Sequence, residues 1–263
     1  MSALIVAAAS DIGLVRADNE DSFLVGERIW AVADGMGGQA AGRTASQIAI
    51  AGLERYDTAG LIDQAGLAAL IDTINDDIVA YGKDHPQDSG LGTTLAGVAQ
   101  VNLAGQQHWL VFHVGDSRVY RLSGQHLIQE TTDHSQVQVM IDQGMVTPDE
   151  ARTHTQRHVL TRCLGGNQPP RPDIRLVPCI DGDRLLVCSD GLTAETDDAT
   201  IERILLSAAS PCNAVDGLIA TALSLGGRDN VTVVVIEVVS EDDNKGDELV
   251  EDTLPGVRNE RDR

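Results

Sequence analysis

Hydrophobic residues recur along the chain with two different spacings, and these spacings divide it into helical and extended segments. Apolar residues three or four positions apart occur in two long segments, 40–55 and 61–81. This spacing places the apolar side chains on one face of a helix and predicts two long helices there. Further helices are predicted at 136–143, at 148–152 with a proline at its start, and at 198–207 and 211–225. Short links join the first two and the last two, which favours two helix pairs that each cover a sheet.

Strand-like segments, short apolar runs or alternating apolar and polar residues, lie before, between and after these helix pairs. Ten strands are predicted, at 4–9, 23–25, 29–33, 95–103, 109–114, 119–122, 126–128, 174–177, 184–188 and 231–239. The four strands between 95 and 128 are separated by short turns, which is typical of a meander. Because strands and helices are segregated along the chain, the order favours an α+β fold of antiparallel sheets covered by helices.

Length and composition favour one domain followed by a tail. A chain of 263 residues is near the upper limit of one hydrophobic core. Residues 1–240 carry all the predicted elements, whereas 241–263 hold nine acidic and four basic residues and almost nothing to bury, which predicts a disordered acidic tail. The net charge of −21 repels nucleic acid and anionic membranes and attracts metal cations and basic protein segments.

Targeting and redox signals predict a soluble cytoplasmic protein, and we expect a monomer. The first ten residues lack the basic segment of a signal peptide, and no apolar run approaches the roughly 20 residues that span a bilayer. Four cysteines without a metal-binding spacing are typical of reduced thiols, and we expect most of them to be buried.

Aspartates stand where several predicted strands begin or end. Asp34 follows the apolar run 29–33 and opens a glycine-rich turn. Asp116 and Asp190 follow two later strands in the same way, and Asp229 directly precedes the last strand. A single Asp-Gly at a strand end indicates an ordinary turn, but the repetition favours a common site. Carboxylates that converge there would suit a hard divalent cation such as Mg²⁺ or Mn²⁺.

Eight motifs in this order resemble the metal-dependent protein serine/threonine phosphatases of the protein phosphatase 2C type, in their bacterial form. They extend over nearly the whole globular part and read Arg16-Ala17-Asp18-Asn19-Glu20-Asp21, Asp34-Gly35-Met36-Gly37-Gly38 with Gly42, Gly92-Thr93-Thr94, Gly115-Asp116-Ser117-Arg118, Asp133-His134-Ser135, Thr161-Arg162-Cys163-Leu164-Gly165, Ser189-Asp190-Gly191-Leu192 and Asp229-Asn230-Val231-Thr232. The resemblance implies a four-layer α-β-β-α sandwich and a centre of two Mn²⁺ or Mg²⁺ ions, with a third, weaker metal site.

The resemblance also implies a role for each matching residue. Asp34 corresponds to the carboxylate that bridges both metals, and it is the expected catalytic centre together with Arg16, which would grip the substrate phosphate. The remaining metal ligands would be the Gly35 carbonyl, Asp190 and Asp229 at one ion, Asp21 or Glu20 at the other, and Asp116 at the third. Segment 133–162 resembles the flap beside the active site.

Oxygen ligands and an arginine fit phosphomonoester hydrolysis on chemical grounds as well. Paired divalent ions lower the pKa of a bound water and neutralise the phosphate charge, and an arginine presents a planar fork to phosphate oxygens. The resemblance implies that the substrates are phosphorylated proteins and that the protein opposes a bacterial serine/threonine kinase. Two alternatives stay open: a pseudophosphatase-like binding module, and a phosphatase of a non-kinase phosphoprotein or small phosphoester.

Several positions depart from the family pattern or allow two interpretations. Gln39 stands where bacterial relatives usually have histidine, and Met36 where animal relatives have one, so no general acid is assigned. His154 and His158 have the spacing of a helical zinc pair or of a solvated face. His113 alternates with apolar neighbours and is expected to be a hydrogen-bonded core histidine, whereas the motif of His134 leaves a structural and a functional role open.

Overall fold

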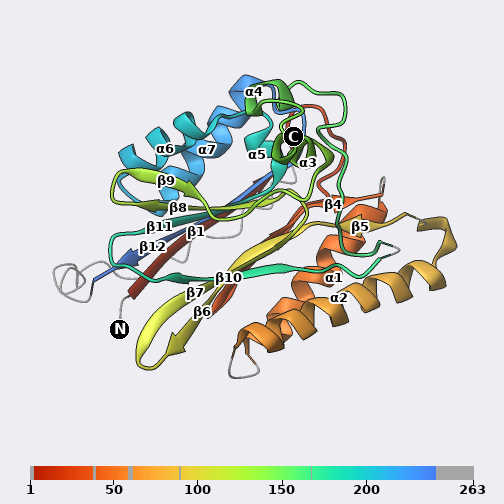
Figure 1. Ribbon diagram of the computed structural model, residues 1–263, viewed down its shortest axis with the longest axis horizontal. Coiled ribbons are helices and arrows are strands. Elements are labelled where there is room, and N and C mark those ends of the chain that lie inside the picture. Colours follow the sequence, from red (N-terminus) through yellow and green to blue (C-terminus); the bar gives the residue numbers. More distant parts are fainter. Residues whose placement is uncertain (1–2, 38–39, 59–61, 89, 167, 241–263) are drawn as a thin grey trace.

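The computed structural model describes residues 3–37, 40–58, 62–88, 90–166 and 168–240. These form two five-stranded antiparallel sheets that face each other, with a helix pair outside each sheet (Figure 1). This is the expected four-layer α-β-β-α sandwich. Gln39 and the predicted tail 241–263 lie outside the described residues.

The first sheet has the strand order β1-β12-β11-β8-β9 and contains both ends of the described chain. Its strands are β1 (Ala3–Asp11), β12 (Val231–Val239), β11 (Arg184–Cys188), β8 (Arg118–Ser123) and β9 (His126–Gln129). Strand β12 lies between β1 and β11, and it pairs with β1 along nine residues, from Ala3 opposite Val239 to Asp11 opposite Val231. That register brings the residues just after β1 close to those just before β12.

The second sheet has the order β10-β7-β6-β3-β2. Its strands are β10 (Asp173–Pro178), β7 (Gln106–Val114), β6 (Leu95–Leu103), β3 (Ile29–Ala33) and β2 (Ser22–Val25). All five residues of β3 are buried, because alternate side chains face the helices on one side and the other sheet on the other. Trp30 meets Trp109 edge to face between the sheets, with ring centroids 5.7 Å apart.

Two helix pairs complete the outer layers, as the apolar spacing predicted. Helices α1 (Ala40–Asp57) and α2 (Gln64–Asp84) cover the second sheet, and α6 (Asp198–Ser207) and α7 (Pro211–Leu225) cover the first (Figure 1). Side-chain caps start three of them: Asp63, Asp197 and Ser210 each accept a backbone N–H from the first turn of α2, α6 and α7. The chain therefore carries its own helix start signals.

The meander predicted between 95 and 128 is wrong in one respect. Strands β6 and β7 pair in the second sheet, but β8 and β9 belong to the first, so the turn after Val114 carries the chain from one sheet to the other. Alternation identifies each strand but does not specify its neighbour. Here the free side of β7 is taken by β10, which pairs with it from Asp173 to Pro178.

Short elements at one end of the sandwich were also missed by the pattern, because they span two to four residues. A two-stranded ribbon joins β4 (Gly35–Met36) to β5 (Gly92–Thr93), and α5 (Asp190–Thr193) follows β11 directly. The sequence did not predict the 3-10 turn η1 (Pro86–Asp88) either. The two short helices of the flap segment 133–162 were predicted, at 136–143 and 148–152, and the structure contains them as α3 (Gln136–Asp142) and α4 (Pro148–Ala151). Three of the expected site residues, Asp34, Gly35 and Asp190, lie on or next to β4 and α5.

Two further expectations concern membrane-spanning helices and the burial of the cysteines. No helix among the described residues is long and apolar enough to cross a membrane. All four cysteines are free, but only Cys188 is buried, since Cys163 and Cys179 are partly accessible and Cys212 on α7 is exposed. The expectation of mostly buried thiols is therefore wrong.

Candidate metal centre

Asp34 directly follows the buried strand β3, and both its backbone N–H and its carbonyl are hydrogen-bonded. Its N–H donates to Thr94 Oγ1 at 3.0 Å, and its carbonyl accepts from Thr94 N and Thr93 Oγ1, both at 2.9 Å. Thr94 Oγ1 is itself 2.7 Å from Ser117 Oγ in the next turn. These bonds join the end of β3 to β5 and to the turn that carries Asp116, so two carboxylates are positioned by one buried hydroxyl network.

The acidic residues expected at the site do converge. The pKa of Asp34 is raised well above its ordinary value, first by burial and then by the charges of Asp21, Asp190, Asp116 and Asp229. The pKa of Asp116 is raised for the same two reasons, with Asp190 and Asp133 as the neighbouring charges. Carboxylates that raise one another's pKa in a buried place are stabilised as anions only by cations. The centre is therefore chemically suited to divalent metals.

Asp21 is held from β12 on the opposite sheet. Thr232 Oγ1 donates to Asp21 Oδ2 at 2.6 Å, and the N–H of Asp21 donates to Asn19 Oδ1 at 3.1 Å. Burial raises the pKa of Asp21 to about 7, although hydrogen bonds from Thr232 and Ser189 oppose the rise. At neutral pH this carboxyl group is therefore close to half protonated without a cation, and a metal would displace the proton.

Glu20 supplies an oxygen atom that the described protein groups leave unpaired. Its Oε1 is buried without a hydrogen-bond partner in the described structure, whereas its backbone is fixed by Asn230 Oδ1 and Ser46 Oγ. Burial raises the pKa of Glu20, and the nearby Arg16 lowers it. A buried carboxylate oxygen without a donor is what a metal-ligand position requires, so the residues fit a metal at this place.

Gly35 follows Asp34 where two backbone segments touch. A Cβ atom at this position would lie 2.2 Å from the carbonyl oxygen of Gly42 and 2.6 Å from that of Glu20. No side chain fits between these backbone atoms, so only glycine lets α1 approach the turn. The close packing fixes the backbone directly after Asp34 against Gly42 and Glu20.

Arg16 and Asp229 form an ion pair on the solvent-accessible side of the centre. Arg16 Nη2 donates to Asp229 Oδ2 at 2.6 Å, and the guanidinium is about half exposed. The pKa of Arg16 is raised, chiefly by this hydrogen bond and also by Asp34 and Asp190, so the side chain stays cationic. It is thus a fixed positive charge that faces solvent on one side and the carboxylates on the other.

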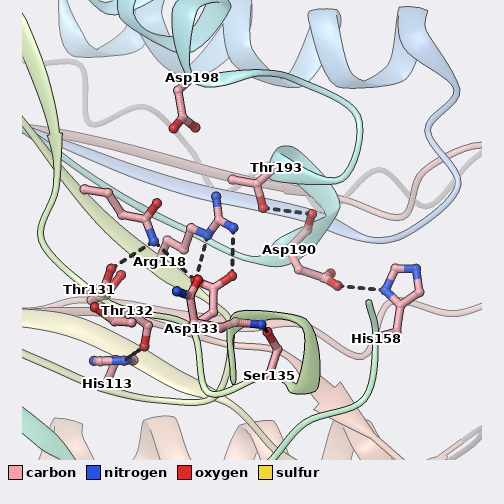
Figure 2. A network of polar contacts seen from close by, with 12 residues as sticks. His113, Arg118, Thr131, Thr132, Asp133, Ser135, His158, Asp190, Thr193 and Asp198 are labelled. Atoms are coloured by element: carbon pink, nitrogen blue, oxygen red, sulfur yellow. Dashed lines mark hydrogen bonds and ion pairs between the residues drawn. The ribbon is translucent and has the colours of Figure 1, made fainter. Parts of the chain in front are cut away.

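The flap segment reaches the same centre through His158 (Figure 2). His158 Nδ1 lies 3.6 Å from Asp190 Oδ2, and the imidazole is about half exposed. The helical zinc pair is not formed, because α4 ends at Ala151 and His154 Nδ1 accepts the N–H of Gln156 instead. Sequence spacing could not reveal the contact with Asp190, since it depends on how the flap folds back.

A buried ion pair anchors the start of the flap (Figure 2). Arg118 donates two hydrogen bonds to the carboxylate of Asp133, at 2.8 and 2.7 Å, and a third to Tyr120 Oη at 2.8 Å. Two parallel N–H···O bonds fix orientation as well as distance. Because Arg118 lies two residues after Asp116, the pair also holds the turn that presents that carboxylate.

The two histidines of uncertain role are buried and stacked, with ring centroids 4.3 Å apart. His113 Nε2 lies 2.8 Å from the carbonyl of Thr132 and donates to it, so the expectation of a hydrogen-bonded core histidine is confirmed. His134 Nδ1 accepts from Gly115 N, and its Nε2 lies 3.2 Å from Asp173. The ligand atoms of His113, His134 and Asp173 lie within 4.8 Å of one another. Most of these atoms already have hydrogen-bond partners, which indicates a structural link at the base of the flap.

The structure therefore brings together all eight expected site residues and adds others. The additions are Thr232 and Ser189 behind Asp21, Arg118 and Asp133 beneath the flap, and His158 opposite Asp190. Four of them stand inside the quoted motifs, so their place was visible but not their partners. A cleft of about 700 Å³ lies between α2 and the residues Gly165, Gly166 and Gln168, and none of the expected metal ligands lines it.

Residues 12–224 match the family model for protein phosphatase 2C. The chain belongs to the protein phosphatase 2C family. It is 43% identical over 242 residues to the serine/threonine protein phosphatase PstP of Mycobacterium tuberculosis, covering 90% of this chain and 45% of PstP. It is 35% identical over 239 residues to the serine/threonine phosphatase Stp of Listeria monocytogenes, covering 87% of this chain and 93% of Stp. The chain thus spans about half the length of PstP and almost all of Stp.

A solved structure of this family has the same architecture. The catalytic domain of PstP in complex with two manganese ions superposes with a TM-score of 0.83 at 40% identity, and the match covers 91% of this chain and all of that one. The expected family and fold are confirmed. The two manganese ions of that relative agree with the metal chemistry that the carboxylates of this chain favour.

Proposed function

We propose that this protein is a metal-dependent protein phosphatase that hydrolyses phosphoserine and phosphothreonine in other proteins. The observation that carries the proposal is the convergence of five aspartates beside the half-exposed Arg16. The family relationship supports it, because relatives that share this fold are named serine/threonine phosphatases. A pure binding module would have no need of all the carboxylates.

The family relationship and the convergence of the carboxylates support the following set of proposed metal ligands. Asp34 is centrally placed among the carboxylates and would bridge two ions, with Asp190, Asp229 and the Gly35 carbonyl on one of them. Asp21 and the unpaired Glu20 oxygen would serve the other, directly or through water, and Asp116 a third, weaker site. Bound Mn²⁺ or Mg²⁺ would supply charge neutralisation and an acidified water as the nucleophile.

Arg16 would hold the substrate phosphate. Its hydrogen bond to Asp229 leaves the other guanidinium nitrogens available at the solvent side, and half of the side chain is accessible. A guanidinium binds two phosphate oxygens at once, which fixes the orientation of the phosphorus as well as its position. Since Asp229 holds Arg16 in place beforehand, little side-chain entropy is lost when the phosphate binds.

The setting we propose is the cytoplasm, where the protein would act as a monomer on phosphoproteins and oppose a serine/threonine kinase in signal transduction. The net charge of −21 supports binding of basic protein segments and argues against nucleic acid as a partner. We further propose residues 1–240 as the catalytic domain. The described strands end at Val239, which is consistent with that boundary.

Phosphate release from a phosphothreonine peptide tests the function. With Mn²⁺ the intact protein is expected to turn the peptide over, and a chelator is expected to abolish the reaction. Asp190→Asn should lower kcat/KM by about two orders of magnitude, because a neutral amide would bind the metal ion more weakly than the carboxylate. Asp216→Asn on the exposed face of α7 is the matched control and should react like the intact protein.

The outcomes separate the candidate functions. Equal turnover with Mn²⁺, with chelator and in Asp190→Asn would show that the metal centre is misassigned. Binding of the phosphopeptide without any release of phosphate would favour the pseudophosphatase-like module. Turnover of small phosphoesters alone would favour a metabolite phosphatase.

A further inference from the structure

Three large apolar side chains are exposed in the loop between β1 and β2, directly before Arg16. Ile12, Leu14 and Val15 form what we call the apolar rim; the side chains of Leu14 and Val15 are 69% and 68% exposed. Single exposed apolar residues are common in soluble proteins and need no explanation. Here three of them lie within four residues, at the edge of the proposed phosphate site.

The backbone of the loop holds the rim in this exposed position. Leu14 N donates to the carbonyl of Gly227 at 2.7 Å, and the Asn230 amide donates to the carbonyls of Ile12 and Asp18 at 2.9 and 3.0 Å. The loop is thus attached on both sides of the rim to the segment that precedes β12. These bonds fix the backbone from which Leu14 and Val15 project, and both residues lie exposed there.

Gly13 shows how tightly this attachment is built. Its φ of +78° lies in the left-handed region, its N–H donates to Asp11 Oδ1 at 2.8 Å, and a Cβ atom there would lie 2.3 Å from the carbonyl oxygen of Asp229. The loop therefore contacts the backbone of a proposed metal ligand just before it presents the apolar rim. A rigid loop loses little entropy when a partner binds it.

The rim is continuous with the place where substrate must lie. Arg16 is the residue after Val15, and its guanidinium contacts Asp229 and faces the carboxylates. A phosphorylated side chain bound at Arg16 is joined to a polypeptide that advances only about 3.3–3.6 Å per residue. Residues within three positions of the phosphorylated one must therefore pass over the elements that surround Arg16, and the rim is one of them.

We propose that the apolar rim is a specificity surface that binds a large apolar side chain near the phosphorylated residue of a protein substrate. The inference rests on the proposed phosphatase function and names its preferred substrate class: phosphoproteins with a leucine-like residue within three positions of the phosphate. The carboxylates around the site would repel acidic residues that flank the phosphorylated residue of a substrate. An apolar side chain that covers Leu14 and Val15 would instead remove apolar surface from water, which is favourable.

A positional series of phosphothreonine peptides tests the rim. Each peptide has serine at all flanking positions except one leucine, which is moved from three positions before to three positions after the phosphothreonine. The intact, Mn²⁺-loaded protein is expected to show a kcat/KM about tenfold higher for leucine at one position than for the all-serine peptide, a step of about 1.4 kcal/mol. Every value is divided by the turnover of p-nitrophenyl phosphate, which has no flanking residues.

The variant and its control use residues of the same type. The double variant Leu14→Ser/Val15→Ser is expected to reduce the leucine preference to less than twofold. The double variant Val25→Ser/Leu206→Ser removes one exposed valine and one exposed leucine from β2 and α6, and it should keep the full preference. Leu14→Lys should replace the preference for leucine by one for glutamate at the same position, a gain that a misfolded protein cannot produce.

The results distinguish failure of the rim from failure of the function. A flat leucine profile in an active protein overturns the rim and leaves the phosphatase assignment intact. A profile that survives unchanged in Leu14→Ser/Val15→Ser overturns it as well. If the Mn²⁺-loaded protein hydrolyses neither the peptides nor p-nitrophenyl phosphate, the proposed phosphatase function is wrong. The specificity proposed for the apolar rim is then wrong as well.

Discussion

Several buried carboxylates in this protein lower the stability of its metal-free folded state. Asp34, Asp21 and Asp116 stand close together, and burial together with neighbouring negative charge raises the pKa of each. Neutral or apolar residues there would avoid this repulsion. Repulsion of this kind does not stabilise the fold. It is expected at a site where a bound ligand neutralises the charges.

The metal-free protein should therefore become more stable when one of these charges is removed. Between the ordinary pKa of an aspartate and the raised value, the folded protein keeps protons that the unfolded chain has released. Unfolding then releases protons, so the stability contributed by these groups is complete at acid pH and is lost as pH rises through each raised pKa, which is about 7 for Asp21 and well above the ordinary value for Asp34 and Asp116. In chelator at pH 8, Asp34→Asn is expected to melt several degrees above the unmodified protein, and the difference should vanish near pH 4.

Calorimetric Tm values over pH 4–8 would measure this effect, with Asp216→Asn as a control for a charge removed from an exposed helix face. A change of 1 kcal/mol corresponds to about 2–4 °C for a domain of this size. With excess Mn²⁺ the order should reverse, because the bound ions stabilise only the protein that retains its bridging carboxylate. A constant difference at all pH values would contradict the repulsion argument.

Secondary-structure elements decide how closely the carboxylates approach one another. Strand β3 delivers Asp34, the β4–β5 ribbon fixes the following turn, and the start of α1 packs against that turn through Gly42. None of these contacts involves a large side chain. The precision of the centre thus depends on backbone packing at the end of the sandwich, where two short strands and a helix start meet.

Gly35→Ala tests this dependence on the backbone. The added methyl group would meet carbonyl oxygens of Gly42 and Glu20, which cannot move aside as a side-chain tip can. We expect a destabilisation of about 1–3 kcal/mol and loss of most phosphatase activity, measured by thermal unfolding and by phosphopeptide turnover. Gly217→Ala in α7 is the control, since its methyl group would lie 3.2 Å from a side-chain carbon of Ile204 and should change both little. Unimpaired activity in Gly35→Ala would contradict the close packing.

At the scale of the whole molecule, the sandwich places residues that are distant in sequence at one end of two facing sheets. Arg16 and Asp229 are 213 positions apart and share a 2.6 Å hydrogen bond. The antiparallel register of β1 and β12 produces this proximity, because it sets the exit of one strand beside the entry of the other. A buried layer of Val, Ile, Leu and Trp residues between the sheets holds that register.

The proposed domain boundary gives a test at this scale. A chain ended at Ser240 keeps every described strand and helix, so it is expected to retain its Tm within about 2 °C and its kcat/KM within twofold. Removal of 241–263 also removes five net negative charges, since nine acidic and four basic residues lie there. A large loss of activity or stability would show that the acidic segment belongs to the working domain.

Local residue patterns by themselves determined most of the elements of this protein. The predicted helix 211–225 and the strands 29–33, 95–103 and 231–239 match the structure residue for residue, because apolar spacing and capping residues act over a few positions. The motif order also identified the family and the fold, and it predicted eight site residues. These features depend on residue type and spacing, which a sequence displays directly.

Only the tertiary structure decided which segments meet. It separated β8 and β9 from β6 and β7, placed His158 opposite Asp190, and left the Glu20 oxygen without a donor among the described residues. It also showed that Leu14 and Val15 are held outward beside Arg16. The physical reason is that strand partners and buried polar contacts depend on the packing of the whole sandwich, whereas local sequence specifies only which face of each element is apolar.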